Sequence, residues 1–199
     1  MKKINTPIIL ASNSPRRKKL LEQINLTFDV IPSNIHEDLN LDLTPSLFVE
    51  HYANEKAKNV ASFNKDKWVI GADTIVAYEK KIFGKPNNKN ESFDMLKRLS
   101  GNIHEVYTGV SIQNQSRGIK NTFHEITEVE FNTLSKIDIH NYINSYKPFD
   151  KAGSYGIQDG FAVHINKING CYYNVMGLPL SKFYKKFFTI INRKIDSDI

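Results

Sequence analysis

The sequence of 199 residues has a single cysteine, Cys171, and no long hydrophobic run. One thiol cannot form an intrachain disulfide and has no second cysteine for a zinc or redox motif, which predicts a reducing, cytoplasmic setting. The apolar run from Ile8 to Ala11 is too short for the core of a signal peptide. Nothing elsewhere approaches the length of a membrane span, so we expect a soluble protein.

Several functional motifs are also absent. The histidines show no HExxH-type or other close ligand spacing, which excludes a zinc site; they are His36, His51, His104, His124, His140 and His164. There is no GxxxxGK[ST] run, so a P-loop ATPase or kinase mechanism is not supported. An RNP-type aromatic motif is missing as well, which argues against an RNA-binding module.

Positive charge is in excess, with 27 Lys and Arg against 21 Asp and Glu and a formal net charge of +6. Such an excess favours a polyanionic partner, either a nucleic acid or a small phosphorylated ligand, and charge alone does not choose between them. The chain is 40% hydrophobic, enough for a sizeable core. We expect residues 1–199 to form one domain.

The hydrophobic pattern is typical of an α/β protein. Ser14 and Pro15 are expected to cap and begin a helix after a short strand. Asn90 is expected to cap another helix, and Gly71 to Thr74 to interrupt a strand. Strands are expected at 8–10, 68–70, 75–78, 106–112, 123–131 and 162–168, the fourth of them half-buried, and further helices at 45–63, 136–146 and 180–191.

Ser12 to Arg17 place two guanidinium groups in the first turn of the expected helix. Cations there oppose the partial positive charge of a helix N-terminus. A bound phosphate would reverse the sign, because backbone N–H groups, serine hydroxyls and arginine forks then converge on an anion. The alternative is a solvated basic turn with an ordinary cap.

A second group joins Asp73, in Gly71–Thr74, to Lys85, in Gly84–Pro86. A carboxylate beside a strand break can hold a divalent metal or activate water, and a returning lysine can hold a phosphate. Glu37 is a candidate second ligand, and oxygen ligands favour magnesium or manganese over zinc. The alternatives are a turn and a solvated acidic loop.

A third segment, Asp150 to Gly160, is rich in glycine and also carries aromatic, amide and charged side chains. Its glycines would let the backbone approach a ligand closely, and Gln158 can both donate to and accept from a base edge. A flexible loop between two elements is the alternative.

Together these segments resemble the Maf family of nucleoside triphosphate pyrophosphatases over almost the whole chain. The similarity rests on ILASNSPRRKKLL, GADTIV, GKP, DKAGSYGIQ and NVMGLPL, in this order. It implies a mixed, strongly curved sheet flanked by helices, with two lobes around a deep cleft in the Maf/ITPase-like manner, and a homodimer. Asp159 departs from the pattern, since the family often has glycine after the glutamine.

The resemblance also implies a role for each matching residue. Asp73 would be the proton acceptor and, with Glu37, a ligand of Mg2+ or Mn2+. The phosphates would be bound by Ser12, Arg16, Arg17, Lys56 and Lys85. Arg16, Thr74 and Gln158 are similar to the branch that acts on dTTP and UTP rather than on 7-methyl-GTP. A nucleotide-binding regulator of cell division, with slow or incidental hydrolysis, is the alternative function.

Overall fold

The computed structural model describes residues 7–192 and has an α/β fold with one mixed seven-stranded sheet, as predicted. The strand order is β2-β1-β3-β5-β6-β7, and β4 also pairs with β3. The strands are β1 (Ile8–Leu10), β2 (Asp29–Val30), β3 (Trp68–Tyr78), β4 (Lys81–Phe83), β5 (Ile103–Asn114), β6 (Ile119–Phe131) and β7 (Ile165–Asn169). Strong curvature of the sheet and a division into two lobes stay predictions.

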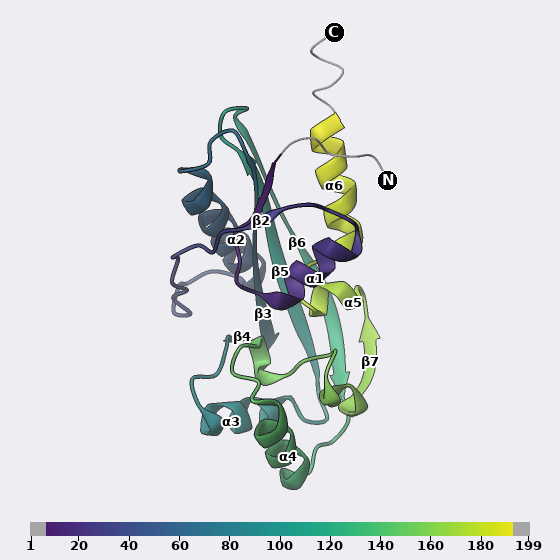
Figure 1. Cartoon of the computed structure of the whole chain (residues 1–199). Coiled ribbons are helices and arrows are strands. Elements are labelled where there is room, and N and C mark those ends of the chain that lie inside the picture. Colours follow the sequence, from purple (N-terminus) through teal and green to yellow (C-terminus); the bar gives the residue numbers. More distant parts are fainter. Residues whose placement is uncertain (1–6, 193–199) are drawn as a thin grey trace.

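Helices surround the sheet at both ends of its long strands. They are α1 (Pro15–Gln23), α2 (Pro45–Ala61), α3 (Lys89–Leu99), α4 (Lys136–Tyr146), α5 (Tyr172–Val175) and α6 (Leu180–Asn192), with short 3-10 turns η1 (Ala152–Ser154) and η2 (Gly160–His164). In Figure 1, α1, α2 and α6 lie around the upper half of β3, β5 and β6, and α3 and α4 lie below. In the described part of the chain no helix is long and apolar enough to cross a membrane.

Both faces of the central strands are buried. Successive side chains of a strand point to opposite faces, and along β3 Ile70 packs with α1 and α6 whereas Ile75 packs with α2. In β5 every residue from Val106 to Asn114 is buried. The prediction of a half-buried strand is therefore wrong, because helices cover this strand on both sides.

The expected strand break at Gly71 to Thr74 is also wrong. Strand β3 runs without interruption and pairs with β5 from Val69 to Ala77. Gly71 is required by close packing of α2, because a Cβ there would lie 2.4 Å from the carbonyl oxygen of Ala53. Gly109 in β5 has the same role, with a hypothetical Cβ 2.2 Å from the carbonyl oxygen of Val49. The glycines let a helix backbone touch the sheet.

One edge of β3 carries a notch. Strand β5 pairs along one edge of β3. The other edge pairs with β1 at Trp68 to Ile70 and with β4 at Val76 to Tyr78. Between them, residues 71–75 have no neighbouring strand on that edge within residues 7–192. Asp73 and Thr74 lie in this stretch and point to opposite faces, so both faces of the sheet are reached from one place.

Several element boundaries differ from the sequence prediction, since β5 and β6 begin earlier than expected and α2 ends at Ala61. Asn88, not Asn90, caps α3, since its side chain accepts from the backbone N–H of Glu91. The strand expected at 162–168 begins only at Ile165, because Asp159 caps the 3-10 turn η2 before it. The predicted cap at Ser14 and the helices at 45–63 and 136–146 are confirmed.

Buried His104 makes stability depend on pH. Its side chain is 1% exposed, and its Nε2 lies 2.9 Å from the Tyr155 hydroxyl. Burial lowers the pKa of His104 from 6.5 to about 3. In the unfolded chain the His104 imidazole is protonated below about pH 6.5, whereas in the folded chain it is protonated only below about pH 3. The free energy of unfolding therefore falls as pH falls from about 6.5 to about 3.

We therefore expect the free energy of unfolding to fall by about 2 kcal/mol when the pH is lowered from 7 to 5, because of His104 alone. Urea denaturation at the two pH values measures this loss, and a His104→Gln variant supplies the contribution of all other groups. The same pH dependence in both proteins would contradict the prediction.

Candidate active site

A cavity of about 610 Å3 opens at the notch beside β3. Its walls come from the turn after β1, the first turn of α1, the middle of β3, and residues 150–159. All the residues singled out from the sequence line it: Ser12, Arg16, Arg17, Glu37, Lys56, Asp73, Thr74, Lys85 and Gln158. The structure thus brings together residues from distant segments, while the role of each stays a prediction.

The first wall is the start of α1. Ser14 caps the helix by accepting from the backbone N–H of Arg17, and Ser12 accepts from the N–H of Ser14. Pro15 occupies the first turn, where its missing N–H costs nothing. The turn therefore presents serine hydroxyls and two guanidinium groups to the cavity, an arrangement suited to an anion.

Arg17 is almost fully buried and held on three sides. Its Nε donates to the Gly177 carbonyl oxygen at 2.8 Å, and its terminal nitrogens donate to Ser12 Oγ at 3.1 Å and Thr74 Oγ1 at 3.0 Å. Burial lowers the pKa of the guanidinium, and the carboxylates of Asp73 and Glu37 oppose that shift. An arginine fork has more N–H donors than these bonds use, so both terminal nitrogens can still bind a phosphate.

Arg16 contacts the 150–159 segment through Asp150, for which the sequence analysis predicts no individual role. The Arg16 guanidinium donates to Asp150 Oδ2 at 2.6 Å and to the Asp150 carbonyl oxygen at 3.1 Å. Lys151 lies 2.8 Å from Asp150 Oδ1. Asp150 stood in the glycine-rich segment, but 134 residues separate it from Arg16, so no local pattern pointed to the pair.

A buried charge cluster lies behind the notch. Lys56 Nζ, supplied by α2, is 2.6 Å from Asp73 Oδ1 and 2.5 Å from Glu37 Oε1. Burial raises the pKa of Asp73, the Lys56 ammonium opposes this, and Glu37 adds to it. Burial also acts to raise the pKa of Glu37, but Lys56 and Lys85 more than offset it, so that pKa is lowered. In this structure Lys56 thus contacts two carboxylates, and its binding of a phosphate stays a prediction.

The donor set suits a hard divalent cation. Asp73 is 2% exposed, and its second oxygen, Oδ2, is buried with no hydrogen-bond partner among the described residues. No group of three or more His, Cys, Asp or Glu that could hold a metal exists within residues 7–192. Magnesium is commonly held by one or two carboxylates together with substrate phosphates and water. Asp73 and Glu37 therefore fit such an ion when a triphosphate is present.

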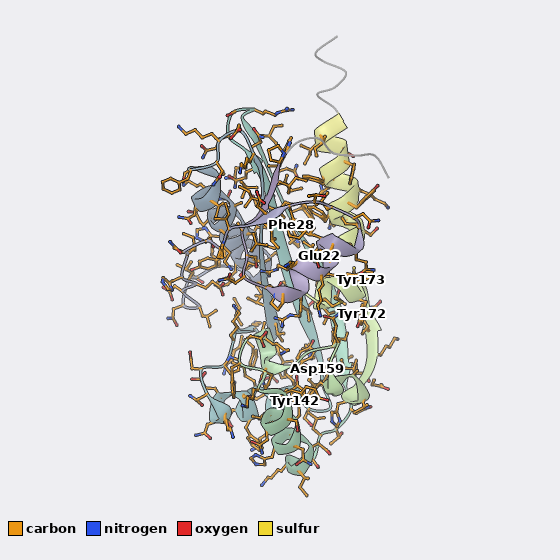
Figure 2. The ribbon with its side chains drawn as sticks, viewed as in Figure 1. Glu22, Phe28, Tyr142, Asp159, Tyr172 and Tyr173 are labelled. Carbon is orange, nitrogen blue, oxygen red and sulfur yellow. The ribbon has the colours of Figure 1, made fainter. Side chains whose placement is uncertain are left out.

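The remaining wall carries Lys85, Gln158 and Asp159. Lys85 follows β4. The preceding residue, Gly84, is linked to η1 because its carbonyl oxygen accepts from the Gly153 N–H. Gln158 is exposed within the cavity lining. Asp159 Oδ2 accepts from the Tyr142 hydroxyl, and Figure 2 shows the two residues together in the lower half. Asp159 thus has a structural role where the family pattern often has glycine.

Comparison with known proteins gives closely similar sequences. A dTTP/UTP pyrophosphatase of Bacillus cereus is 46% identical over 90% of this chain and 93% of its own length. One of Bacillus anthracis is 48% identical with the same coverage, and one of Bacillus pumilus is 47% identical over 88% of this chain and 92% of its own length.

Among solved structures, the Ham1 protein of Staphylococcus aureus matches 63% of this chain and 72% of its own, with 16% identity and a TM-score of 0.45. That similarity is too low to support an argument about function. The family description "Maf-like protein" matches residues 7–189. With that match and with relatives at almost half identity over nine tenths of its length, this chain belongs to the Maf family.

Proposed function

We propose that this protein hydrolyses nucleoside triphosphates, chiefly dTTP and UTP, to the nucleoside monophosphate and pyrophosphate. The carrying observation is the buried Asp73 carboxylate, one oxygen of which has no hydrogen-bond partner among residues 7–192, in a cavity that Arg16 and Arg17 also line. A protein that only binds nucleotides needs no such carboxylate. The names of the Bacillus relatives support the same reaction and the same substrates.

In the proposed reaction, Asp73 orients a water molecule and accepts its proton while the water oxygen bonds to the α-phosphorus. The bond from that phosphorus to the bridging oxygen breaks, and pyrophosphate leaves. Arg17, with donors remaining on both terminal nitrogens, and Lys85 neutralise charge on the leaving group. Positioning and electrostatics supply most of the catalysis in phosphoryl-type transfer.

Asp73 and Glu37 would hold Mg2+ or Mn2+, and the bound ion would neutralise phosphate charge and make the water easier to deprotonate. Lys56 would favour the ionised form of both carboxylates, because its ammonium contacts one oxygen of each. Ser12 would present its hydroxyl to a phosphate beside Arg17.

Preference for pyrimidine nucleotides is assigned to Arg16, Thr74 and Gln158. All three line the cavity, and they come from α1, β3 and the 150–159 segment. Arg16 is partly exposed and reaches Asp150 across the cavity. We extend the proposal to a homodimer in the cytoplasm, as the resemblance and the single cysteine imply.

The test is pyrophosphate release by the purified protein with Mg2+ or Mn2+ across dTTP, UTP, CTP, 7-methyl-GTP, dITP and ATP. We expect dTTP and UTP to be preferred. A preference for 7-methyl-GTP or another purine would keep the reaction and overturn the assignment of the specificity residues. Tight nucleotide binding without turnover would replace the enzyme by the nucleotide-binding regulator.

A further inference from the structure

A hydrogen-bond network leads from the cavity to the neighbouring strand β5 and on to α5. Arg17 donates to Thr74 Oγ1 at 3.0 Å, and Thr74 Oγ1 lies 2.9 Å from Thr108 Oγ1 on the neighbouring strand. Thr108 Oγ1 lies 3.0 Å from the Asn174 carbonyl oxygen in α5. Thr108 and Asn174 are both 0% exposed, so water does not compete for the bond between them, whereas Thr74 also lines the cavity.

The direction of each bond follows from the partners. A carbonyl oxygen only accepts, so the Thr108 hydroxyl must give its single proton to Asn174. Thr108 can then only accept from Thr74, whose own proton is used in that bond. The Thr74 oxygen is left as an acceptor, which is what the Arg17 N–H requires.

The network also closes on itself. The carbonyl oxygen of Asn174 accepts from the Gly177 N–H at 2.9 Å, and the Gly177 carbonyl accepts from Arg17 Nε at 2.8 Å. The side chain of Asn174 anchors this turn by donating to the Val106 carbonyl oxygen and to Thr127 Oγ1. Arg17 is therefore held by one ring of bonds in which Thr108 is the buried link.

We propose that Thr108 is a positioning residue: by taking the proton of Thr74 it fixes that hydroxyl as an acceptor and so orients Arg17 toward the phosphates. Thr108 does not line the cavity and acts only through its neighbours. The same bonds limit Thr74 to accepting from a nucleotide, never donating to it. The inference rests on the proposed function for its kinetic consequence, but the orientation of Arg17 can be measured without turnover.

The decisive variant is Thr108→Val, which keeps the shape of the side chain and removes the hydroxyl. Thr74 is then free to turn its proton elsewhere, and Arg17 loses a fixed acceptor. We expect KM for dTTP to rise about tenfold, as for a lost hydrogen bond to a charged group, with kcat changed less than about threefold. Thr108→Ser restores the hydroxyl and is expected to restore the wild-type KM.

Two readouts are independent of catalysis: the Kd of inorganic tripolyphosphate by calorimetry and the NMR signal of the Arg17 Nε–H. We expect Thr108→Val to weaken tripolyphosphate binding about tenfold and to shift the Arg17 signal. The matched control is Ser111→Ala, which removes another buried hydroxyl of β5 that hydrogen-bonds to Gln113 and Thr122 instead. It should leave both readouts unchanged.

A folded Thr108→Val protein with the wild-type Kd and an unshifted Arg17 signal would overturn the proposal, as would an equal effect of Ser111→Ala. If Thr108→Val does not fold, Thr108→Cys takes its place with the same two outcomes, because a thiol is a weak donor. A wild-type protein that turns over no nucleotide would defeat the proposed function alone, since tripolyphosphate and the Arg17 signal still decide the role of Thr108.

Discussion

Replacing Asp73 by Asn is expected to lower kcat for dTTP by at least about a thousandfold while nucleotide binding persists. The amide cannot accept the proton of the attacking water, and it is a poorer ligand for a hard cation. Arg17, which is proposed to bind the triphosphate, keeps its position because it is held by Gly177, Ser12 and Thr74 rather than by Asp73.

The measurement pairs steady-state pyrophosphate release with calorimetric binding of a non-hydrolysable dTTP analogue. Asp66→Asn is the matched control, since it makes the same chemical change at an exposed residue before β3 that does not line the cavity. Wild-type turnover in Asp73→Asn would rule out the role assigned to this carboxylate. Loss of binding as large as the loss of turnover would instead show that Asp73 mainly organises the site.

Replacing Gly71 by Ala is expected to lower the free energy of unfolding by about 3 kcal/mol, at the upper end of the cost of overpacking. The new Cβ would lie 2.4 Å from the Ala53 carbonyl oxygen and 2.7 Å from the Ala57 backbone nitrogen. Both atoms belong to the backbone of α2, so relief requires the helix to move. Lys56 lies on that helix and moves with it, which predicts a loss of activity as well.

Urea denaturation and the turnover of the folded protein measure the two effects of Gly71→Ala. Gly118→Ala is the control, since no atom lies within 4 Å of its added Cβ and only its left-handed backbone, with φ +61, opposes the change. It should cost about 1 kcal/mol and leave turnover unchanged. Equal destabilisation by the two variants would show that contact with α2 is not the cause.

Much of the architecture followed from local patterns. Ser14-Pro15 marked the start of α1 because capping is decided by a side chain and its next few residues. The helix over 136–146 was predicted with its observed bounds for the same reason. Each signal acts within one or two turns of the chain, which is the range that a single sequence displays.

The errors came where tertiary contacts decide. The sequence pattern around Gly71 predicts a break in a strand, whereas the glycine allows α2 to pack closely on the sheet. The strand expected over 162–168 started late because Asp159 accepts from the Phe161 N–H and starts a 3-10 turn. Alternating hydrophobicity does not reveal a capping bond.

Most of the candidate site is predictable from the sequence, because charged residues that bind anions lie in recognisable motifs. Asp150 and Thr108 lack such a signal. Asp150 contributes by accepting a hydrogen bond from Arg16 in α1, and Thr108 by its hydrogen bond to the Thr74 hydroxyl on the adjacent strand. Such pairs depend on the register of the sheet and on which walls of the cavity face each other. A local sequence motif contains neither kind of information.

The notch in β3 also bears on the order in which the molecule assembles. Strands β3, β5 and β6 form an antiparallel meander, in which β5 and β6 are joined by a tight turn. The parallel pairing of β1 with β3 must wait for a crossover that contains α1, β2 and α2, and such long closures form slowly. Because Ser12, Arg16 and Arg17 follow β1, the proposed triphosphate site is complete only once β1 is paired with β3. A nucleotide that binds only this complete fold would stabilise it against unfolding.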